Sequence, residues 1–280
     1  MPFRADGPGH AERHGGRSLQ LRPIRKVIAL AFLSRTRARR DDLLKRWQKT
    51  LWYQLTNPLM WLNGKRYRFS LAPKEGLRVH LGCGREHYLP GWLNVDSNCV
   101  TARVDLWINL LHRFPFRNAS VEALYTWHVL EHLPYDGILP VLKEMYRCLQ
   151  EGGVARIGVP HVGSAARAYV AGNADWFVDY PMQHSSLGGK FANFTLCAGE
   201  HLQMFDFDFL AELLHDAGFE RIEQHRPGDS ERFDATVLTR ESVHPKAECR
   251  DLPYTLVVEA IKGSAASSRG DEFASRVAAA

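Results

Sequence analysis

The sequence predicts an α/β fold built around a mostly parallel sheet. From Leu77 onward, short apolar segments typical of strands alternate with longer segments of helical periodicity. The first strand-like segment runs directly into the turn Gly82-Cys83-Gly84, and a glycine turn after a strand lets a ligand approach the backbone closely. With 280 residues, 45% of them hydrophobic, the chain can bury the core of one domain and carry extensions.

Strands are predicted where short apolar and β-branched runs are bounded by turn residues. In chain order, these segments are residues 77–81, 92–96, 121–126, 154–159, 221–225, 235–239 and 254–261. A helix is predicted over residues 135–149, with Asp136 available as its N-cap. Its apolar face consists of Ile138, Leu142, Met145 and Leu149. A second helix is predicted over residues 209–217, because Gly218 is a typical helix stop.

Residues 161–205 have no clean periodicity and contain many Gly, Asn and aromatic residues. A stretch of this length without regular structure usually forms a lid or a binding loop. We therefore expect an irregular substrate loop here, with Tyr180 and Asn193 among its candidate contacts.

The N-terminal part has a different pattern. Residues 1–20 are predicted to be disordered, and a helical pattern follows from residue 23 to about residue 54. Asn57-Pro58 and Asn63-Gly64 are expected to end that helix. The predicted organisation is a basic, partly helical extension at residues 1–70, a main domain at 71–262 and a flexible tail at 263–280.

Charge is distributed unevenly along the chain. Residues 1–70 contain 16 Lys and Arg against 4 Asp and Glu, while the rest of the chain is net acidic. An acidic body argues against an extended nucleic-acid footprint, because phosphate neutralisation drives such binding. The aromatic residues of the extension are expected to pack on the domain; the alternative is a peripheral membrane or acidic-partner contact through residues 23–68.

No membrane anchor or signal peptide is predicted. The longest apolar run near the N-terminus, residues 27–33, is much shorter than the roughly 20 residues that a spanning helix needs. The five cysteines are dispersed without ligand spacing, which favours free thiols in a reducing compartment. A cytoplasmic protein is expected, peripheral to the inner membrane if the extension contacts lipid.

The residues after the glycine turn narrow the type of cofactor. The third glycine of a dinucleotide-binding fingerprint would fall at His87, which disfavours a pyrophosphate cradle. Asp96 ends the next predicted strand, closer to the turn than in the dinucleotide pattern. A carboxylate at this position can accept hydrogen bonds from both ribose hydroxyls of a nucleoside.

A series of short blocks keeps a characteristic order along the chain. The blocks are Val79 through Gly84, Leu89 through Asp96, Val104-Asp105-Leu106, Phe114-Pro115-Phe116, His128 through His132, Leu149 through Gly153, Ile157 through Pro160, His201 through Asp206, Ala217-Gly218-Phe219 and Val258-Glu259-Ala260. Together they resemble class I methyltransferases of the broad methyltransferase-11 type. They are most similar to a bacterial subgroup found beside glycosyltransferases in surface-polysaccharide gene clusters. The resemblance covers about residues 76–262.

This resemblance implies a Rossmann-like class I methyltransferase fold, with a seven-stranded, mostly parallel sheet, helices on both faces, and S-adenosylmethionine as the cofactor. It also implies that Gly82-Cys83-Gly84 contacts the amino-acid end of the cofactor and that Asp96 holds the ribose. Asp105 and Leu106 would meet the adenine.

The resemblance assigns roles to two histidines as well. His128 would face the cofactor near the transferred methyl group. His80 stands where many class I enzymes have an acidic residue, so water-mediated contact with the cofactor ammonium would be altered.

His128-x-x-Glu131-His132 also matches a zinc-protease pattern in which two histidines bind the metal from one helix face. Here the segment follows a short strand and runs into Pro134, so a long helix around it is disfavoured. No third ligand is evident from the spacing, and no metal site is predicted.

A methyl transfer to a hydroxyl needs a group that removes the proton, and histidine suits this task near neutral pH. His201 is our candidate base because it ends the predicted substrate loop and matches a recurring family position. His161, directly after the strand that ends at Pro160, is the second candidate. For both residues, a purely structural role is the alternative.

The favoured function is O-methylation of a sugar, a glycan or a related hydroxylated small molecule. One alternative is a nucleotide-dependent oxidoreductase, against which the missing third glycine speaks. Another is a non-catalytic scaffold on a methyltransferase fold, docked through its basic extension.

Overall fold

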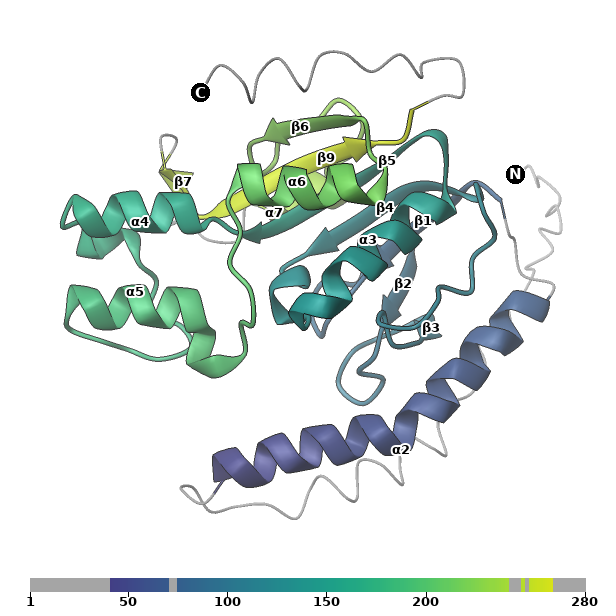
Figure 1. The fold of residues 1–280 in the computed structure, drawn as a ribbon, viewed down its shortest axis with the longest axis horizontal. Helices are drawn as coiled ribbons and strands as arrows, with labels where there is room; N and C mark the ends of the chain where they lie inside the picture. The colour runs from purple at the N-terminus through teal and green to yellow at the C-terminus, as the bar shows by residue number, and fades with distance from the viewer. Residues whose placement is uncertain (1–40, 71–74, 242–247, 250–251, 264–280) are drawn as a thin grey trace, which may run out of the picture. The chain divides into compact units, whose positions relative to one another are not determined.

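The computed structural model describes residues 41–70, 75–241, 248–249 and 252–263 (Figure 1). The main sheet has seven strands in the order β3-β2-β1-β4-β5-β9-β6. They are β1 (Leu77–Leu81), β2 (Leu93–Asp96), β3 (Leu106–Trp107), β4 (Val121–Trp127), β5 (Leu149–Pro160), β6 (Arg221–His225) and β9 (Thr255–Ile261). A small ladder joins β7 (Glu248–Cys249) to β8 (Leu252–Pro253). The predicted seven-stranded, mostly parallel sheet is confirmed.

The strand directions determine where a ligand site can form. All neighbours in the main sheet are parallel except β9, which is antiparallel to both β5 and β6. β6 therefore runs in the same direction as β5. The carboxyl ends of β1 to β6 meet at one edge of the sheet, which is where open α/β sheets bind ligands.

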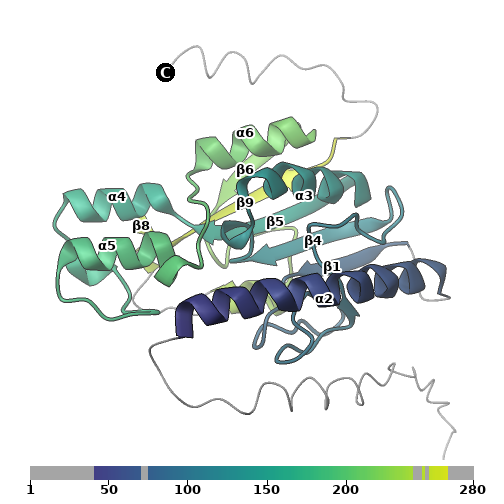
Figure 2. The same cartoon turned by 60° about the horizontal axis from the view of Figure 1, so that its bottom comes forward.

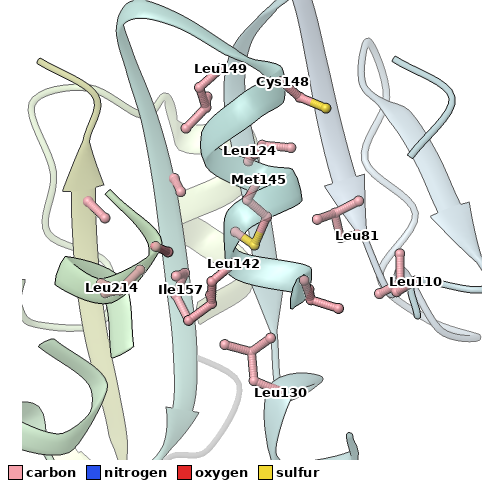
Figure 3. Packing of buried hydrophobic residues seen from close by; sticks show 14 of the residues in the cluster. Leu81, Leu110, Leu124, Leu130, Leu142, Met145, Cys148, Leu149, Ile157 and Leu214 are labelled. Carbon is pink, nitrogen blue, oxygen red and sulfur yellow. The ribbon is translucent and has the colours of Figure 1, made fainter. Parts of the chain in front are cut away.

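Helices cover both faces of the sheet. The helices are α2 (Asp41–Phe69), α3 (Tyr135–Cys148), α4 (Val162–Val170), α5 (Leu187–Leu196), α6 (Phe207–Ala217) and α7 (Ala235–Glu241), with short 3₁₀ turns at Leu130–His132, Ala174–Trp176 and Cys197–Gly199. α3 and α6 pack side by side on one face (Figures 1 and 2). In Figure 3, Leu142 and Met145 of α3 lie against Leu124 and Ile157 of the central strands.

The opposite face carries a smaller core, because side chains alternate along each strand. On β4, Leu124 belongs to the α3 and α6 core, whereas Tyr125 belongs to the second core with Phe233 and Val237. Helices on both faces, as expected, are thus confirmed.

Two helix ends follow their predicted signals and one does not. Asp206 caps α6 by accepting a hydrogen bond from Phe209 N, and Gly218 ends the helix at a φ of 108°. α3 begins after Pro134 without a side-chain cap. Asp136 lies within its first turn instead, where a carboxylate favours the positive end of the helix dipole, so its assignment as N-cap was wrong.

The strand predicted at residues 235–239 is the helix α7. Its β-branched residues misled the prediction, because tertiary packing overrides weak strand propensity. Asp234 starts the helix by accepting from Thr236 N, and Val237 is fully buried in the second core. Conversely, the short strand β3 was not predicted.

Residues 161–205 are not an irregular loop. α4 and α5 pack against each other beyond the ends of β4 and β5 (Figures 1 and 2). They have their own core, which contains Ala165, Ala168, Trp176, Phe177 and Phe194. The apolar residues of this region therefore stabilise a helical subdomain, in a pattern too short and interrupted to show periodicity.

Helix α2 continues through both predicted stops. Asn57 Oδ1 accepts a hydrogen bond from Asn109 Nδ2 at 2.9 Å, and Asn63 Nδ2 donates to the carbonyl of Trp107 at 2.9 Å. Met60 is fully buried between them. The residues expected to break the helix are therefore those that attach it to β3 and the following segment, and these contacts offset the backbone hydrogen bond lost at Pro58.

The opposite face of α2 exposes an apolar stripe. The stripe consists of Leu51, Leu55, Leu59, Leu62 and Phe69, which are 49% to 80% exposed. Within the described part of the chain, no helix is long and apolar enough to cross a membrane. The predictions for residues 1–20, for 23–40 and for the tail after residue 263 concern parts of the chain outside the described residues.

A buried ion cluster attaches α7 and the segment after β6 to the sheet. Arg156 of β5 is fully buried and donates to Glu241 at 2.6 and 2.7 Å and to Glu259 at 2.7 Å. It also donates to the carbonyl of Arg226 at 3.3 Å, while Glu241 accepts from Gly228 N at 2.8 Å. This cluster positions residues 226–229 at the carboxyl edge of the sheet.

Candidate functional site

A cavity of about 1120 Å³ lies at the carboxyl edge of the sheet. Its walls come from the glycine turn and the residues that follow it, from the end of β4, from the α4 and α5 region, from the segment after β6 and from the start of β9. Small-molecule sites usually enclose about 300–1,000 Å³. The volume therefore suits a cofactor together with a second small molecule.

The glycine turn forms one wall. Gly82 and Gly84 both have left-handed φ values, 72° and 57°, and both line the cavity. A Cβ on Gly82 would lie 2.3 Å from the side chain of Val129, whereas Gly84 faces open space. The first glycine is required by packing and the second leaves the backbone open to a ligand.

Asp96 lies behind this turn at the end of β2. Its Oδ2 accepts from Gly84 N at 2.8 Å and its Oδ1 from Asn98 N at 2.7 Å. An ionised carboxylate offers about four acceptor positions, so two stay available. The described residues lining the cavity do not include Asp96, but its bond to Gly84 places it against the lining.

Two predicted cofactor residues are buried beneath the turn. His80 is fully buried, with Nδ1 paired to Asn94 at 3.2 Å, and burial lowers its pKa to about 4. Cys83 is also fully buried, and burial raises the pKa of its thiol to about 12. These pKa values make His80 neutral at neutral pH and Cys83 a packing residue rather than a nucleophile. Neither side chain lines the cavity.

Asp105 and Leu106 lie on the next strand connection. Asp105 accepts from Asn94 N at 2.9 Å and from the Tyr88 hydroxyl at 3.0 Å. Leu106 is buried in β3. In the structure Asp105 ties β2 to the residues after the glycine turn, and neither residue is in the lining of the cavity.

His128 lines the cavity at the end of β4, with a left-handed φ of 54°. Its Nδ1 is 3.1 Å from Glu131 Oε1 and its Nε2 is 3.2 Å from the Thr255 hydroxyl. The zinc-protease interpretation required His128 and His132 on one helix. That geometry is absent, because only Leu130–His132 is helical and as a 3₁₀ turn.

His201 also lines the cavity, and the backbone of Glu131 determines its place. The carbonyl of Glu131 accepts from Leu202 N at 2.7 Å and from Gln203 N at 3.2 Å. The rings of His201 and His132 then meet edge to face at 5.0 Å. Burial lowers the pKa of His201, which favours a neutral imidazole.

His161, the second candidate base, has a structural role in this fold. It is 5% exposed, and its Nδ1 accepts from Ser164 N at 3.4 Å as the N-cap of α4. Its pKa is lowered by burial. It is not among the described residues that line the cavity, so the geometry favours His201.

Several cavity residues were missed by the sequence analysis. Trp127 lies over Gly158, where a Cβ would be 2.2 Å from the indole. Residues 226–229 follow β6, and Tyr254 precedes β9. Because β6 is parallel to β5 and β9 is antiparallel to both, the segment after β6 and the segment before β9 both lie at the carboxyl edge of the sheet. Knowing the direction of these two strands would have identified the cavity residues in both segments.

Comparison with known proteins gives a family but no near relative. A family model described as a methyltransferase domain matches residues 67–224. No curated protein matches the chain.

Two solved structures that resemble the chain share little sequence identity with it. A methyltransferase from Archaeoglobus fulgidus that depends on S-adenosylmethionine is 15% identical and has a TM-score of 0.42, with 75% of this chain and 99% of that chain covered. A possible histamine N-methyltransferase from Thermotoga maritima is 16% identical with a TM-score of 0.43, covering 77% and 95%. These likenesses carry no information about substrate. The family match extends over more than half of the chain, and the chain belongs to this family of methyltransferase domains.

Proposed function

We propose that the protein transfers a methyl group from S-adenosylmethionine to a hydroxyl group of a sugar, a glycan or a related small molecule. The observation that carries the cofactor assignment is the glycine turn backed by Asp96 at the rim of a large cavity. The family supports the reaction type. The resemblance of this sequence to the polysaccharide-associated subgroup is the reason for proposing a sugar or glycan as the acceptor.

The chain's own residues fit this cofactor. The open backbone at Gly84 accommodates its amino-acid end, and the free acceptor positions of Asp96 suit two ribose hydroxyls. His128, held by Glu131 and Thr255, faces the same cavity. When bound, S-adenosylmethionine supplies a methyl group on a positively charged sulfur. The protein aligns the acceptor oxygen with that methyl group, and alignment of this kind lowers barriers by several kcal/mol.

The remaining cavity suits a sugar. Trp127, Tyr180 and Tyr254 place aromatic side chains in its walls, and aromatic rings pack well on the apolar C–H face of a sugar ring. The acceptor's hydroxyl proton must leave as the oxygen–carbon bond forms. We infer that His201, which lines this cavity, takes part in removing that proton.

Calorimetric titration with S-adenosylmethionine tests the cofactor assignment. Asp96→Ala should weaken binding by about 1.5–3 kcal/mol, roughly ten- to a hundredfold, because charge-assisted hydrogen bonds to the ribose are lost. Glu122→Ala, at an exposed site on β4, is the control and should bind as the wild type does. Absence of wild-type binding at millimolar cofactor would overturn the assignment and favour a non-catalytic scaffold.

A radiolabelled-methyl assay tests the acceptor. With sugars, glycans and nucleotide sugars as acceptors, the labelled product should keep its methyl group when it is treated with base, as expected for a methyl ether. Transfer only to amines or carboxylates would contradict the proposed O-methylation, while leaving the cofactor assignment intact.

We further propose that α2 binds an anionic membrane surface through its apolar stripe. Lys65, Arg66 and Arg68 are exposed beside the stripe. Lys65 lies 5.1 Å from the centre of the exposed Trp61 ring. An apolar helix face flanked by cations and an aromatic residue is typical of helices that lie in the interface of an anionic bilayer.

Cosedimentation with vesicles tests this contact. The double variant L55Q/L59Q should lower binding to phosphatidylglycerol vesicles at least tenfold, because each buried leucine contributes about 1.5–3 kcal/mol. V170Q, which alters a valine that is 85% exposed on α4, should have no effect. Equal binding to neutral vesicles, or a dimer in solution that the double variant dissociates, would contradict the proposal.

A further inference from the structure

Three potential metal ligands meet at one wall of the cavity. Glu131, His132 and His201 each offer a ligand atom, and these atoms lie within 4.8 Å of one another. All three residues line the cavity. The sequence did not predict this group, because His201 is far from the other two residues along the chain.

The carboxylate of Glu131 is only partly compensated. The side chain is fully buried, and its Oε2 has no hydrogen-bond partner among the described residues. His128 contacts only Oε1. Leaving one oxygen of a buried carboxylate without a partner is costly, and a bound cation reduces that cost.

His132 is oriented as a ligand. Its Nδ1 lies 2.9 Å from the carbonyl oxygen of Glu200, so Nδ1 carries the proton and donates. In the neutral ring this leaves the lone pair on Nε2, which faces Glu131 Oε1 at 3.9 Å. Metal-binding histidines commonly donate their other nitrogen to a backbone carbonyl in this way.

The distances are close to those of a metal site. Ligand atoms at about 2.1 Å from one tetrahedral ion are separated by about 3.4 Å. Small side-chain rotations therefore bring the three atoms into place. The two Glu131 carbonyl hydrogen bonds that hold the 202–203 segment keep His201 next to His132.

We propose that Glu131, His132 and His201 bind one divalent transition-metal ion in the wall of the cavity. Two imidazoles and one carboxylate favour zinc, manganese, iron or cobalt over magnesium or calcium, which prefer oxygen ligands. Three protein ligands leave coordination positions open to the cavity.

The role that we assign to the ion, activation of the acceptor hydroxyl, rests on the proposed function. An acceptor hydroxyl bound at an open position becomes more acidic, as metal-bound water does. Its proton passes to solvent, and the resulting oxygen displaces the cofactor's sulfur from the methyl carbon. In this arrangement His201 is a ligand that positions the ion rather than the base that takes the proton.

A second cluster is a natural comparison. Glu223, His225 and Glu259 also have ligand atoms within 4.8 Å of one another. Their carboxylates, however, are already bonded to cationic side chains: Arg232 bridges Glu223 and Glu259 at 2.8 Å, and Arg156 pairs with Glu259 at 2.7 Å. This charge compensation disfavours an additional cation there.

Titration of the metal-free protein with Co²⁺ alone tests the proposal. Wild-type protein should bind one equivalent and develop the visible d–d absorption of cobalt with nitrogen ligands. Loss of a residue that only supports a ligand weakens metal binding about 10- to 100-fold. H132A and H201A each remove a ligand and should therefore weaken Co²⁺ binding by more than that. H225A, at the comparison cluster, should bind as the wild type does. His132 has a partly exposed side chain, so H132A preserves the core if H201A unfolds.

The possible outcomes separate the two proposals. Unchanged Co²⁺ binding in H132A, loss of binding in H225A, or no absorption with the wild type would overturn the metal site. None of these outcomes depends on S-adenosylmethionine, whose binding is measured in its own titration. Cobalt binding without cofactor binding would leave the metal site standing and overturn the proposed function.

Discussion

The backbone carbonyl of Glu131 joins the segment after β4 to the cavity residues around His201. By accepting from Leu202 N and Gln203 N, it ties the end of β4 to the segment that follows α5. Its side chain at the same time supports His128, and the neighbouring His132 bonds to the carbonyl of Glu200. Glu131 thus links His128, at the end of β4, to the segment that contains His201.

The role of each histidine in or near the site follows from its hydrogen bonds rather than from its position in the sequence. His80 is paired inside the sheet and His161 caps a helix. His128 bridges Glu131 and Thr255. His128, His132 and His201 all line the cavity close to the buried, incompletely paired carboxylate of Glu131. His128 is already bonded to it, and the other two form the candidate ligand group with it.

Local signals in the sequence were sufficient for the glycine turn and the strands around it. A strand, a glycine turn and a second strand ending in Asp96 are specified by short segments, and all three are present. Strand β3 was too short to recognise, and α7 was mistaken for a strand because its β-branched residues pack on the sheet. At Asn57 and Asn63, helix-breaking tendencies were overcome by contacts with residues distant in sequence.

The remaining walls of the cavity could not be predicted, because they depend on long-range contacts. Nothing in the local sequence indicates that His201 returns to His132, or that residues 226–229 reach the same edge through the direction of β6.

Crystals grown with Co²⁺ and S-adenosylhomocysteine would test the central claim, that this edge holds a nucleoside and a metal ion side by side. The account predicts one anomalous peak within bonding distance of Glu131, His132 and His201, and a ribose hydrogen-bonded to Asp96. An anomalous peak at His225 instead, or a nucleoside bound away from Asp96, would contradict it.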